Sequence, residues 1–451
     1  MELKKVKLYD TYQAKVVDLV PINPGEVSIY YCGPTVYNYP HVGNLRPVVT
    51  FDLLNRVLSA LGYKVHMISN YTDIDDKIIK KALDLHKTEK EVSDFYIDYY
   101  QKVLDGLDVL PLEYHPRVSN YIPQIVDFIS DIMGKGLAYK ASNGDVYFSV
   151  QKDPSYGSLS KIKPDELKAG ARIEESKLKQ SPLDFALWKN TSDGGIKFDT
   201  SIGLGRPGWH TECVVMINSY FKKPLIDIHG GGFDLKFPHH ENEMAQSWAY
   251  ANTRLANIWM HVGFLDMNGT KMSKSLGNVV LAQQAIDKFG GNALRHFFLS
   301  TYYRSPVNYT EESMETSLKE VEKYQAILYK FQAKAGLEGI RYTSDYDQIS
   351  FDGFMDFLAD DLNVANAITV LESVLKKANA DLRNPHVSIE GLSSSYNTLA
   401  KMLHVLGFTY PDLVISQEDK NDYLAYNKAR NNKDYVLSDT LRKKLSAKGL
   451  I

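Results

Sequence analysis

Residues 237–243 read FPHHENE and place two histidines and two glutamates within five consecutive positions. Pro238 suits the first position of a helix, and His239 and Glu243, four residues apart, then share one helix face. His240 is three residues before Glu243, so spacing alone does not exclude it. Imidazole and carboxylate groups are zinc ligands. The segment therefore predicts a metal site, an acid–base pair, or only the polar start of a helix.

The chain has two cysteines, Cys32 and Cys213, which are 213 − 32 = 181 positions apart. A disulfide framework is implausible in a chain of 451 residues whose N-terminus lacks a secretion signal. The plain interpretation is two buried apolar thiols. The alternative is that the thiols meet in space as metal ligands, because zinc favours four-coordinate sites rich in sulfur and nitrogen.

Two other segments have the residue types of phosphate sites. PHVGN (Pro40–Asn44) lies where a helix should begin, and a helix N-terminus offers backbone N–H groups to phosphate. There His41 adds a donor and Gly43 allows a close approach. KMSKS (Lys271–Ser275) follows a predicted hairpin, residues 259–272, with its turn at Asn268-Gly269, and its two lysines suit a polyphosphate clamp. Taken singly, each segment fits an ordinary turn or a solvated basic loop equally well.

The elements around these segments predict a parallel sheet. Residues 26–32 form a β-rich run, residues 45–61 have helical periodicity, and residues 64–70 form a second β-rich run. A strand, helix and strand of these lengths make a βαβ unit. Ligands of open parallel sheets bind beyond the carboxyl ends of the strands. Cys32 ends the first predicted strand and should therefore lie at the ligand-bearing edge.

Composition sets wider limits. Hydrophobic residues are 44% and charged residues 24% of the chain, which is typical of globular proteins. The sequence has no apolar run near the ~20 residues that span a bilayer, and we expect a cytoplasmic protein that binds no membrane. The formal net charge is −3, so only local patches predict nucleic-acid binding. One such patch is residues 421–451, with seven Lys or Arg and three Asp (7 − 3 = +4).

The first phosphate segment, followed about 230 residues later by KMSKS, resembles the paired motifs of class I aminoacyl-tRNA synthetases. YYCGPTVYNYPHVGN, GRPGWHTECVVM, IDIHGGGFDLKFPHHENEMAQS, FMDFLADDLNVANAITVL and ARNNKDYVLSDTLRKKL resemble the cysteinyl-tRNA synthetases, and the resemblance runs from end to end. The order of five spaced motifs makes it specific. The chain ends at Ile451, where family members often continue with a short further segment.

The resemblance implies ATP-dependent attachment of L-cysteine to tRNA(Cys) through a cysteinyl-adenylate, with Mg²⁺ accompanying ATP. It implies three catalytic side chains that stabilise the α-phosphoryl transition state, namely His41, Lys271 and Lys274. The implied ATP contacts are His41, Gly43, Asn44 and Lys274. Asn44 stands where the family motif has histidine, so a cationic role at that position is absent here.

The resemblance also implies one zinc ion per chain, with His239 rather than His240 as its imidazole ligand. The implied ligands are Cys32, Cys213, His239 and Glu243. Zinc binds a thiolate strongly, whereas shape alone distinguishes cysteine from serine by only about 10–200-fold. We therefore expect zinc to select the substrate's sulfur. The implied cysteine contacts are Gly33, Thr72, Trp209, His229 and Asp234, of which Trp209 and His229 are equally plausible as core residues.

The predicted fold class is α/β, with a Rossmann-like parallel-sheet catalytic domain, an inserted connective domain and a C-terminal α-helical bundle. The predicted boundaries are 1–115 and 206–265 for the catalytic domain, 116–205 for the insertion, 266–315 for the KMSKS loop and stem-contact region, and 316–451 for the helical anticodon-binding region. In the basic patch, candidate tRNA contacts are Arg430, Lys433, Arg442 and Lys443, interleaved with tyrosines that can stack on bases. We expect a monomer.

Two other functions fit parts of this pattern. A zinc-dependent cysteine ligase that transfers activated cysteine to a small amine would share the zinc and ATP motifs, but the basic tail argues against it. A non-catalytic, zinc-stabilised RNA-binding protein would have no use for an intact KMSKS segment. A small-molecule nucleotidyltransferase would need neither the zinc ligands nor the helical tail. Charging of tRNA with cysteine is therefore the favoured hypothesis.

Overall fold

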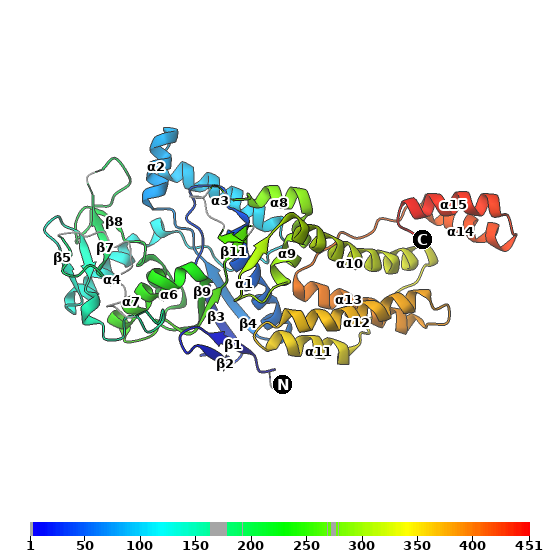
Figure 1. Ribbon diagram of the computed structural model, residues 1–451, viewed down its shortest axis with the longest axis horizontal. Coiled ribbons are helices and arrows are strands. Elements are labelled where there is room, and N and C mark those ends of the chain that lie inside the picture. Colours follow the sequence, from blue (N-terminus) through cyan, green and yellow to red (C-terminus); the bar gives the residue numbers. More distant parts are fainter. Residues whose placement is uncertain (1–2, 163–177, 192, 268, 272–276, 278) are drawn as a thin grey trace. The chain divides into compact units, whose positions relative to one another are not determined.

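The computed structural model describes residues 3–162, 178–191, 193–267, 269–271, 277 and 279–451 (Figure 1). The chain forms two compact units, which are described separately here. The first comprises residues 1–284 and 303–308, and the second comprises residues 285–302 and 309–451. The predicted region 266–315 is therefore divided between the two units. The predicted insertion 116–205 lies within the first unit.

A four-stranded parallel sheet forms the centre of the first unit, in the order β10-β9-β3-β4. Its strands are β3 (Glu26–Tyr31), β4 (Lys64–Ser69), β9 (Ile226–Gly232) and β10 (Ala256–Val262). Five of the six residues of β3 are buried, as expected for a parallel strand covered on both faces. The helix α1 (Val42–Ala60) links β3 to β4. The predicted βαβ unit is confirmed.

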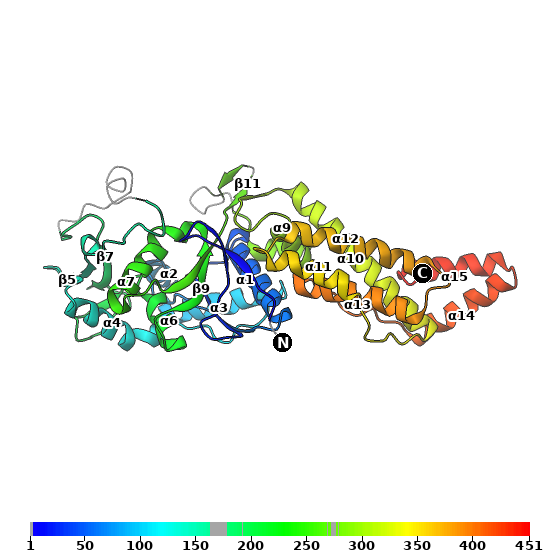
Figure 2. The same cartoon turned by 90° about the horizontal axis from the view of Figure 1, so that it is seen from below.

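The other elements of the first unit surround this sheet (Figures 1 and 2). The helices are α2 (Asp76–Leu85), α3 (Glu89–Asp105), α4 (Ile122–Gly134), α6 (Glu212–Phe221) and α7 (Glu241–Ala251), with short turns η1 (Val118–Tyr121), η2 (Val150–Lys152), η3 (Phe233–Leu235) and η4 (Lys236–His240). The strands β1 (Lys7–Asp10) and β2 (Lys15–Asp18) form an antiparallel pair. Phe237 is extended (φ −143°, ψ 134°) within η4, and the residues after it are helical and continue directly into α7. This kink agrees with the predicted helix start at Pro238.

The segment predicted as an insertion contains a second, antiparallel sheet. Its order is β5-β6-β7-β8, with β5 (Ala138–Lys140), β6 (Val146–Phe148), β7 (Phe185–Asn190) and β8 (Gly205–Pro207). The helix α4 packs in the same apolar core as these strands. The short strands expected from the sequence are therefore present, together with a helix that the strand pattern did not predict.

The predicted hairpin at the end of the first unit is shorter than the sequence indicated. Its two arms are β11 (Leu265–Met267) and β12 (Thr270–Lys271), and β11 also joins β13 (Val307–Tyr309). The residues WMHV, which were expected in the first arm, belong instead to β10 of the parallel sheet. A continuous apolar run is typical of a buried parallel strand, and the structure shows that these residues form one.

The second unit is helical, as predicted. After α8 (Ala282–Phe289), which crosses the boundary, it contains α9 (Gly291–Leu299), α10 (Glu311–Glu338), α11 (Gln348–Ala359), α12 (Val364–Arg383), α13 (Ile389–Leu406), α14 (Gln417–Asn431) and α15 (Tyr435–Ala447). The run 351–380 looked continuous in the sequence, but positive φ angles at Asp361 and Leu362 separate α11 from α12. Asn363 then caps α12 by accepting a hydrogen bond from Asn366 N–H. No helix in the described part of the chain is long and apolar enough to cross a bilayer.

Candidate functional site

Four segments bring the predicted metal ligands together at the carboxyl end of β3. Cys32 directly follows β3, and Cys213 is the second residue of α6. His239 lies in the turn η4, and Glu243 lies in the first turn of α7. One donor atom from each residue lies within 4.8 Å of the other three. The carboxyl ends of parallel strands lie at one edge of the sheet, and Cys32 at the end of β3 therefore lies near the segment that follows β9, which contains His239 and Glu243.

The distances among these donors suit a tetrahedral zinc ion. Zn–S bonds of ~2.3 Å and Zn–N or Zn–O bonds of ~2.0 Å require donors about 3.3–3.8 Å apart. Cys32 Sγ lies 3.9 Å from Cys213 Sγ and 3.9 Å from Glu243 Oε1. Cys213 Sγ lies 3.8 Å from His239 Nε2, which lies 2.9 Å from Glu243 Oε1. The chemistry of the donors fits a zinc ion, and the four distances depart from the tetrahedral range by at most about 0.4 Å.

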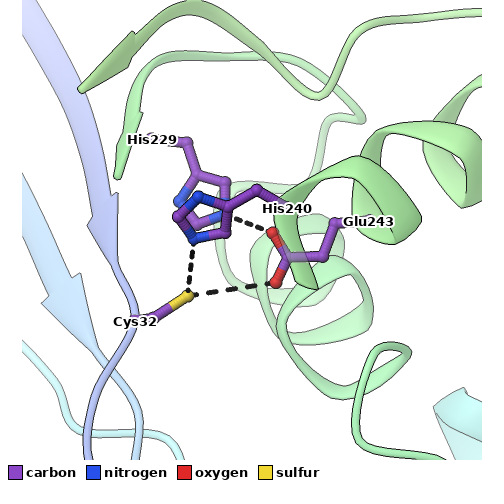
Figure 3. A group of neighbouring side chains, drawn as sticks. All are labelled: Cys32, His229, His240 and Glu243. Carbon is purple, nitrogen blue, oxygen red and sulfur yellow. Dashed lines mark hydrogen bonds and ion pairs between the residues drawn. The ribbon is translucent and has the colours of Figure 1, made fainter. Parts of the chain in front are cut away.

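A second group of possible donors shares two residues with the first (Figure 3). It consists of Cys32, His229, His240 and Glu243. His240 Nε2 lies 3.3 Å from Cys32 Sγ, and His229 Nε2 lies 2.6 Å from Glu243 Oε2. This group has only one thiol. The group with Cys213 has two thiols and matches zinc's preference for sulfur better, so His229 and His240 are suited to orienting its ligands.

The two histidines of Figure 3 are themselves held by hydrogen bonds. His229 Nδ1 lies 2.9 Å from the carbonyl oxygen of Tyr30 in β3. His240 Nδ1 lies 2.8 Å from His261 Nε2, and His261 Nδ1 lies 2.9 Å from Thr11 Oγ1. The carbonyl of Tyr30 requires the proton on Nδ1 of a neutral His229. A neutral His229 then presents a bare Nε2, whereas a protonated one donates to Glu243.

Burial and mutual charge shift the pKa values of three of the predicted metal ligands. Burial lowers the pKa of His239, but the Glu243 carboxylate and the Cys213 thiol outweigh burial and raise it to about 10. Burial opposes ionisation of Glu243, yet His239 and His229 hold its pKa well below the usual range. Burial likewise opposes ionisation of Cys213, but hydrogen bonding with Cys32 and His239 lowers its pKa to about 7. Without metal, His239 and Glu243 therefore form a buried ion pair.

A cavity of about 460 Å³ opens beside the predicted metal ligands and has Cys32 in its wall. It is also lined by six other predicted site residues, which are Gly33, His41, Gly43, Asn44, Trp209 and Asp234. The ring of Trp209 stacks on His239 with 4.4 Å between ring centroids. The metal centre and the predicted ATP segment therefore face one cavity.

The predicted cysteine contacts occupy different depths. Gly33 lines the cavity, and a Cβ there would lie 1.7 Å from the carbonyl oxygen of Asn70, so only glycine fits. Thr72 and His229 are buried and lie behind the wall. Thr72 Oγ1 donates to Glu212 Oε2 at 2.9 Å. Direct contact of Thr72 or His229 with cysteine stays a prediction, because both already have partners within the protein.

Several residues at the site carried no clear signal in the sequence. Asn70 accepts a hydrogen bond from Gly33 N–H at 2.8 Å, and Glu212 receives the Thr72 hydroxyl. Burial raises the pKa of Glu212 well above the usual range. His210 Nδ1 lies 3.0 Å from His239 Nδ1, and burial lowers the His210 pKa to about 3. His210 follows Trp209 in the GWH segment, and this position next to a predicted cysteine contact was its only sequence signal.

The segment PHVGN begins α1, as predicted. His41 is the residue before the helix, and its backbone N–H donates to Asn44 Oδ1 at 3.0 Å. Asn44 therefore helps to fix the first turn of α1. This structural role needs only the amide oxygen of asparagine and no positive charge. Gly43 follows in the cavity wall, where a Cβ would lie 3.0 Å from His41 Nδ1. The helix N-terminus thus faces the cavity, as a phosphate site requires.

The two predicted lysines of KMSKS are at the limit of what the structure describes. Lys271 is the last residue of β12, and its side chain lies outside the described atoms. Lys274 lies outside the described residues. Their catalytic roles stay predictions. The hairpin that precedes them begins at the cavity wall, because Leu265 of β11 lines the cavity.

The candidate tRNA contacts lie in the second unit, on α14, on α15 and in the turn between them. Lys433, Arg442 and Lys443 are exposed, and the Arg430 guanidinium lies 5.5 Å from the centre of the Tyr426 ring. Arg442 is 3.5 Å from Asp439. Two further lysines differ, because Lys444 of α15 and Lys448 directly after it pair with acids of α14 and hold the two helices together.

The family of tRNA synthetases class I (C) catalytic domains matches residues 18–319, and the DALR domain family matches residues 353–410. The chain is 40% identical over 460 residues to a cysteine–tRNA ligase of Geobacillus sp. (strain WCH70), covering 100% of this chain and 97% of that one. It is also 40% identical over 457 residues to a cysteine–tRNA ligase of Staphylococcus carnosus (strain TM300), covering 99% and 97%.

A solved structure with the same fold is the Mycobacterium tuberculosis methionyl-tRNA synthetase in complex with methionyl-adenylate. It aligns with a TM-score of 0.62 over 92% of this chain and 96% of that chain, at 13% identity. A leucyl-tRNA synthetase of Agrobacterium radiobacter K84 in a ternary complex aligns with a TM-score of 0.62 at 11% identity, covering 87% of each chain. At these identities, the likeness shows the fold alone.

Proposed function

The chain belongs to the cysteine–tRNA ligase family of class I aminoacyl-tRNA synthetases, and we propose that a zinc ion held by Cys32, Cys213, His239 and Glu243 selects its amino acid. As a family member, it joins L-cysteine to tRNA(Cys) at the expense of ATP. The observation that carries the proposal is the convergence of four zinc donors within 4.8 Å, with Cys32 in the cavity wall. We propose one zinc ion per chain and Mg²⁺ bound with ATP.

The zinc ion would supply selectivity for sulfur. Bound zinc coordinates a thiolate and lowers the pKa of a thiol, whereas the hydroxyl of serine remains neutral and is a weak ligand. Four protein ligands leave the substrate's sulfur to enter as an additional one. Trp209, stacked on His239, offers an apolar wall beside the substrate's side chain. Together these features support a discrimination that shape alone does not provide.

The part of the cavity wall formed by the N-terminus of α1 serves activation of the amino acid. The carboxylate oxygen of cysteine attacks the α-phosphorus of ATP, the bond to the β-phosphate bridging oxygen breaks, and pyrophosphate leaves. The N-terminus of α1 presents backbone N–H groups and His41 to the phosphate, which favours the charge that develops there. We assign Lys271 and Lys274 to the same charge. Gly33 lines the cavity directly after β3, where we place the amino or carboxylate group of cysteine.

Transfer of cysteine to a small amine is less well supported than transfer to tRNA. The match to cysteine–tRNA ligases covers 97% of those chains and includes the helical second unit. The DALR family matches within that unit. A ligase for a small amine would have no evident use for the exposed basic residues of α14 and α15.

The proposal is tested with cysteine-dependent and serine-dependent pyrophosphate exchange, measured with zinc-loaded and zinc-stripped enzyme. We expect the loaded enzyme to favour cysteine by far more than the ~200-fold that shape provides, and we expect stripping to lose most of this preference. Charging of bulk tRNA with labelled cysteine completes the measurement. If stripped enzyme rejected serine as strongly as loaded enzyme, zinc would not be the selector.

A matched pair of substitutions ties the selectivity to the site. Glu243→Ala removes a buried ligand, and we expect both zinc content and cysteine activation to fall by at least 100-fold. Glu113→Ala removes a partly exposed carboxylate that pairs with His66 away from the metal ligands, and we expect it to keep both. Equal zinc content in the two variants would contradict the assigned ligand set.

A further inference from the structure

The cavity has a third wall that neither cysteine nor ATP uses in the proposed function. One wall belongs to the metal centre and Trp209, and another to the N-terminus of α1 and the segments after β9 and β10. The third, which we call the tyrosine wall, consists of Tyr37, Tyr39, Lys77, Tyr96 and Tyr100. It combines the loop after β3 with residues of α2 and α3. The cavity is thus bounded by more surface than the activation step requires.

The tyrosine wall is aromatic, carries one lysine and is partly open to solvent. Tyr37 and Tyr39 are half-buried, and Lys77 is exposed. The Lys77 ammonium lies 5.5 Å from the centre of the Tyr37 ring. An aromatic ring beside a lysine is the combination that binds unpaired nucleotides, because the ring stacks on a base and the lysine attracts phosphate.

The ring of Tyr39 is held in a fixed orientation. It meets Tyr99, Tyr96 and Phe95 edge to face, with centroid distances of 4.5, 5.3 and 6.3 Å. Phe95 is itself 50% exposed, which is unusual for phenylalanine and extends the aromatic surface beyond the cavity. A pre-formed aromatic surface loses little conformational entropy when a base stacks on it.

The chemistry of the second step requires a third reactant in this cavity. The terminal ribose hydroxyl of tRNA attacks the carbonyl carbon of the cysteinyl-adenylate, and a new ester C–O bond forms. The bond between that carbon and the phosphate oxygen breaks, AMP leaves with the electron pair, and the hydroxyl proton passes to AMP or to water. The attacking oxygen must come within about 3–3.5 Å of the carbonyl carbon. The terminal nucleotide must therefore enter while cysteine and AMP occupy the other two walls.

From this arrangement we propose that the tyrosine wall binds the 3′-terminal nucleotide of the tRNA, with its base stacked on Tyr37 or Tyr39 and its phosphate near Lys77. The inference rests on the proposed function, since it names a subsite for that function's tRNA substrate. It assigns these residues to positioning for the transfer step and predicts that they do not affect formation of the adenylate.

The experiment compares Tyr37→Leu and Lys77→Ala with the matched control Lys80→Ala, which removes another exposed lysine of α2 outside the cavity wall. Pyrophosphate exchange reports adenylate formation. Single-turnover transfer from preformed enzyme-bound cysteinyl-adenylate to tRNA reports the second step. We expect transfer to slow by roughly 5- to 100-fold in Tyr37→Leu, the range for loss of one stacked base, with exchange within twofold of wild type. Lys80→Ala should leave both rates unchanged.

A direct signal comes from tRNA whose terminal adenine is replaced by the fluorescent base 2-aminopurine. Stacking on the tyrosine wall should quench its fluorescence in the wild-type complex, and Tyr37→Leu should restore it. Transfer and fluorescence unaffected by both substitutions would overturn the subsite while leaving the proposed function intact. A raised KM for ATP would also overturn it, because the wall would then bind ATP. A wild-type enzyme that exchanged pyrophosphate but charged no tRNA would instead refute the proposed function.

Discussion

The metal centre and the α14–α15 helices hold their charged groups in opposite ways. The four predicted metal ligands come from separate segments, and Cys213, His239 and Glu243 are at most 2% exposed. The basic residues of α14 and α15 lie close in sequence and mostly in solvent. A buried charge needs its partners because burial without them costs several kcal/mol, whereas a solvated charge needs none. Loss of one group should therefore be severe in the first region and mild in the second.

The largest expected effect separates the two possible donor groups of the metal centre. His239→Ala should weaken zinc binding by at least 100-fold, because it removes a ligand beside two thiols. His240→Ala should weaken it by about 10- to 100-fold at most, as expected for a residue that only orients a ligand. Zinc affinity is measured by competition with a chelator, and zinc content by metal analysis.

The reverse order would assign the ion to the group that contains His229 and His240, which Figure 3 shows. His86→Ala provides a control, because His86 is an exposed histidine at the end of α2. Its substitution should leave zinc affinity unchanged. Comparing the buried His239 and His240 with the exposed His86 then tests whether the loss of zinc affinity follows the burial of the histidine that is removed.

Part of the candidate metal site could be predicted from the sequence. The spacing of His239 and Glu243 left His240 and non-metal interpretations open, and the resemblance to cysteinyl-tRNA synthetases supplied the four ligands that the structure brings together. The hydrogen bonds around it could not be predicted. His229 contacts Glu243, and His240 contacts His261, through pairings between elements distant in the chain. Sequence periodicity reports which face a residue occupies but not which atom it meets there.

Fold elements show the same limit. The βαβ unit follows from local patterns, whereas the run WMHV looked like a hairpin arm and is a strand of the parallel sheet. Its partner, β9, supplies the context that the local pattern lacks. The break between α11 and α12 depends on two residues with positive φ, Asp361 and Leu362, and leucine gives no sequence signal for that conformation.

A second prediction concerns the pH dependence of zinc binding. With the His239 pKa raised to about 10, this imidazole is protonated at neutral pH in the metal-free protein, and zinc must displace that proton. Burial also raises the Cys32 pKa well above its usual range, so its thiol loses a proton too. Zinc affinity should therefore rise by at least tenfold per pH unit between pH 7 and 9.

Chelator competition across this pH range measures the slope, and calorimetry in two buffers with different ionisation enthalpies counts the protons released. We expect at least one proton per zinc ion at pH 7.5. A flat profile would show that the ligands are already deprotonated without metal.

The α14–α15 helices were easier to place but harder to interpret. A count of basic residues predicted one patch, whereas the structure divides the patch by function. Lys444 bridges to Glu418 and Asp422, and Lys448 bridges to Asp419, so these lysines join the two helices. The hydroxyl of Tyr423 donates to Glu338 on α10, which makes it a packing residue as well. A charge count cannot reveal such pairings, because it does not show which acid meets which lysine, and Glu418 and Asp419 lie outside the counted residues 421–451.

The smallest expected effect comes from the exposed basic residues that remain. Substituting Arg430 and Lys443 together by alanine should raise the KM for tRNA severalfold and leave pyrophosphate exchange unchanged. If both contact phosphate, the slope of log affinity against log salt should become shallower by about 1.4–1.8, or 0.7–0.9 for each contact. Lys376→Ala, an exposed lysine of α12, should change neither quantity. An unchanged salt slope in the double variant would move the tRNA contact elsewhere on the second unit. A loss as large as that of His239→Ala would instead contradict the distinction between the two regions, because solvated charges contribute separately and modestly.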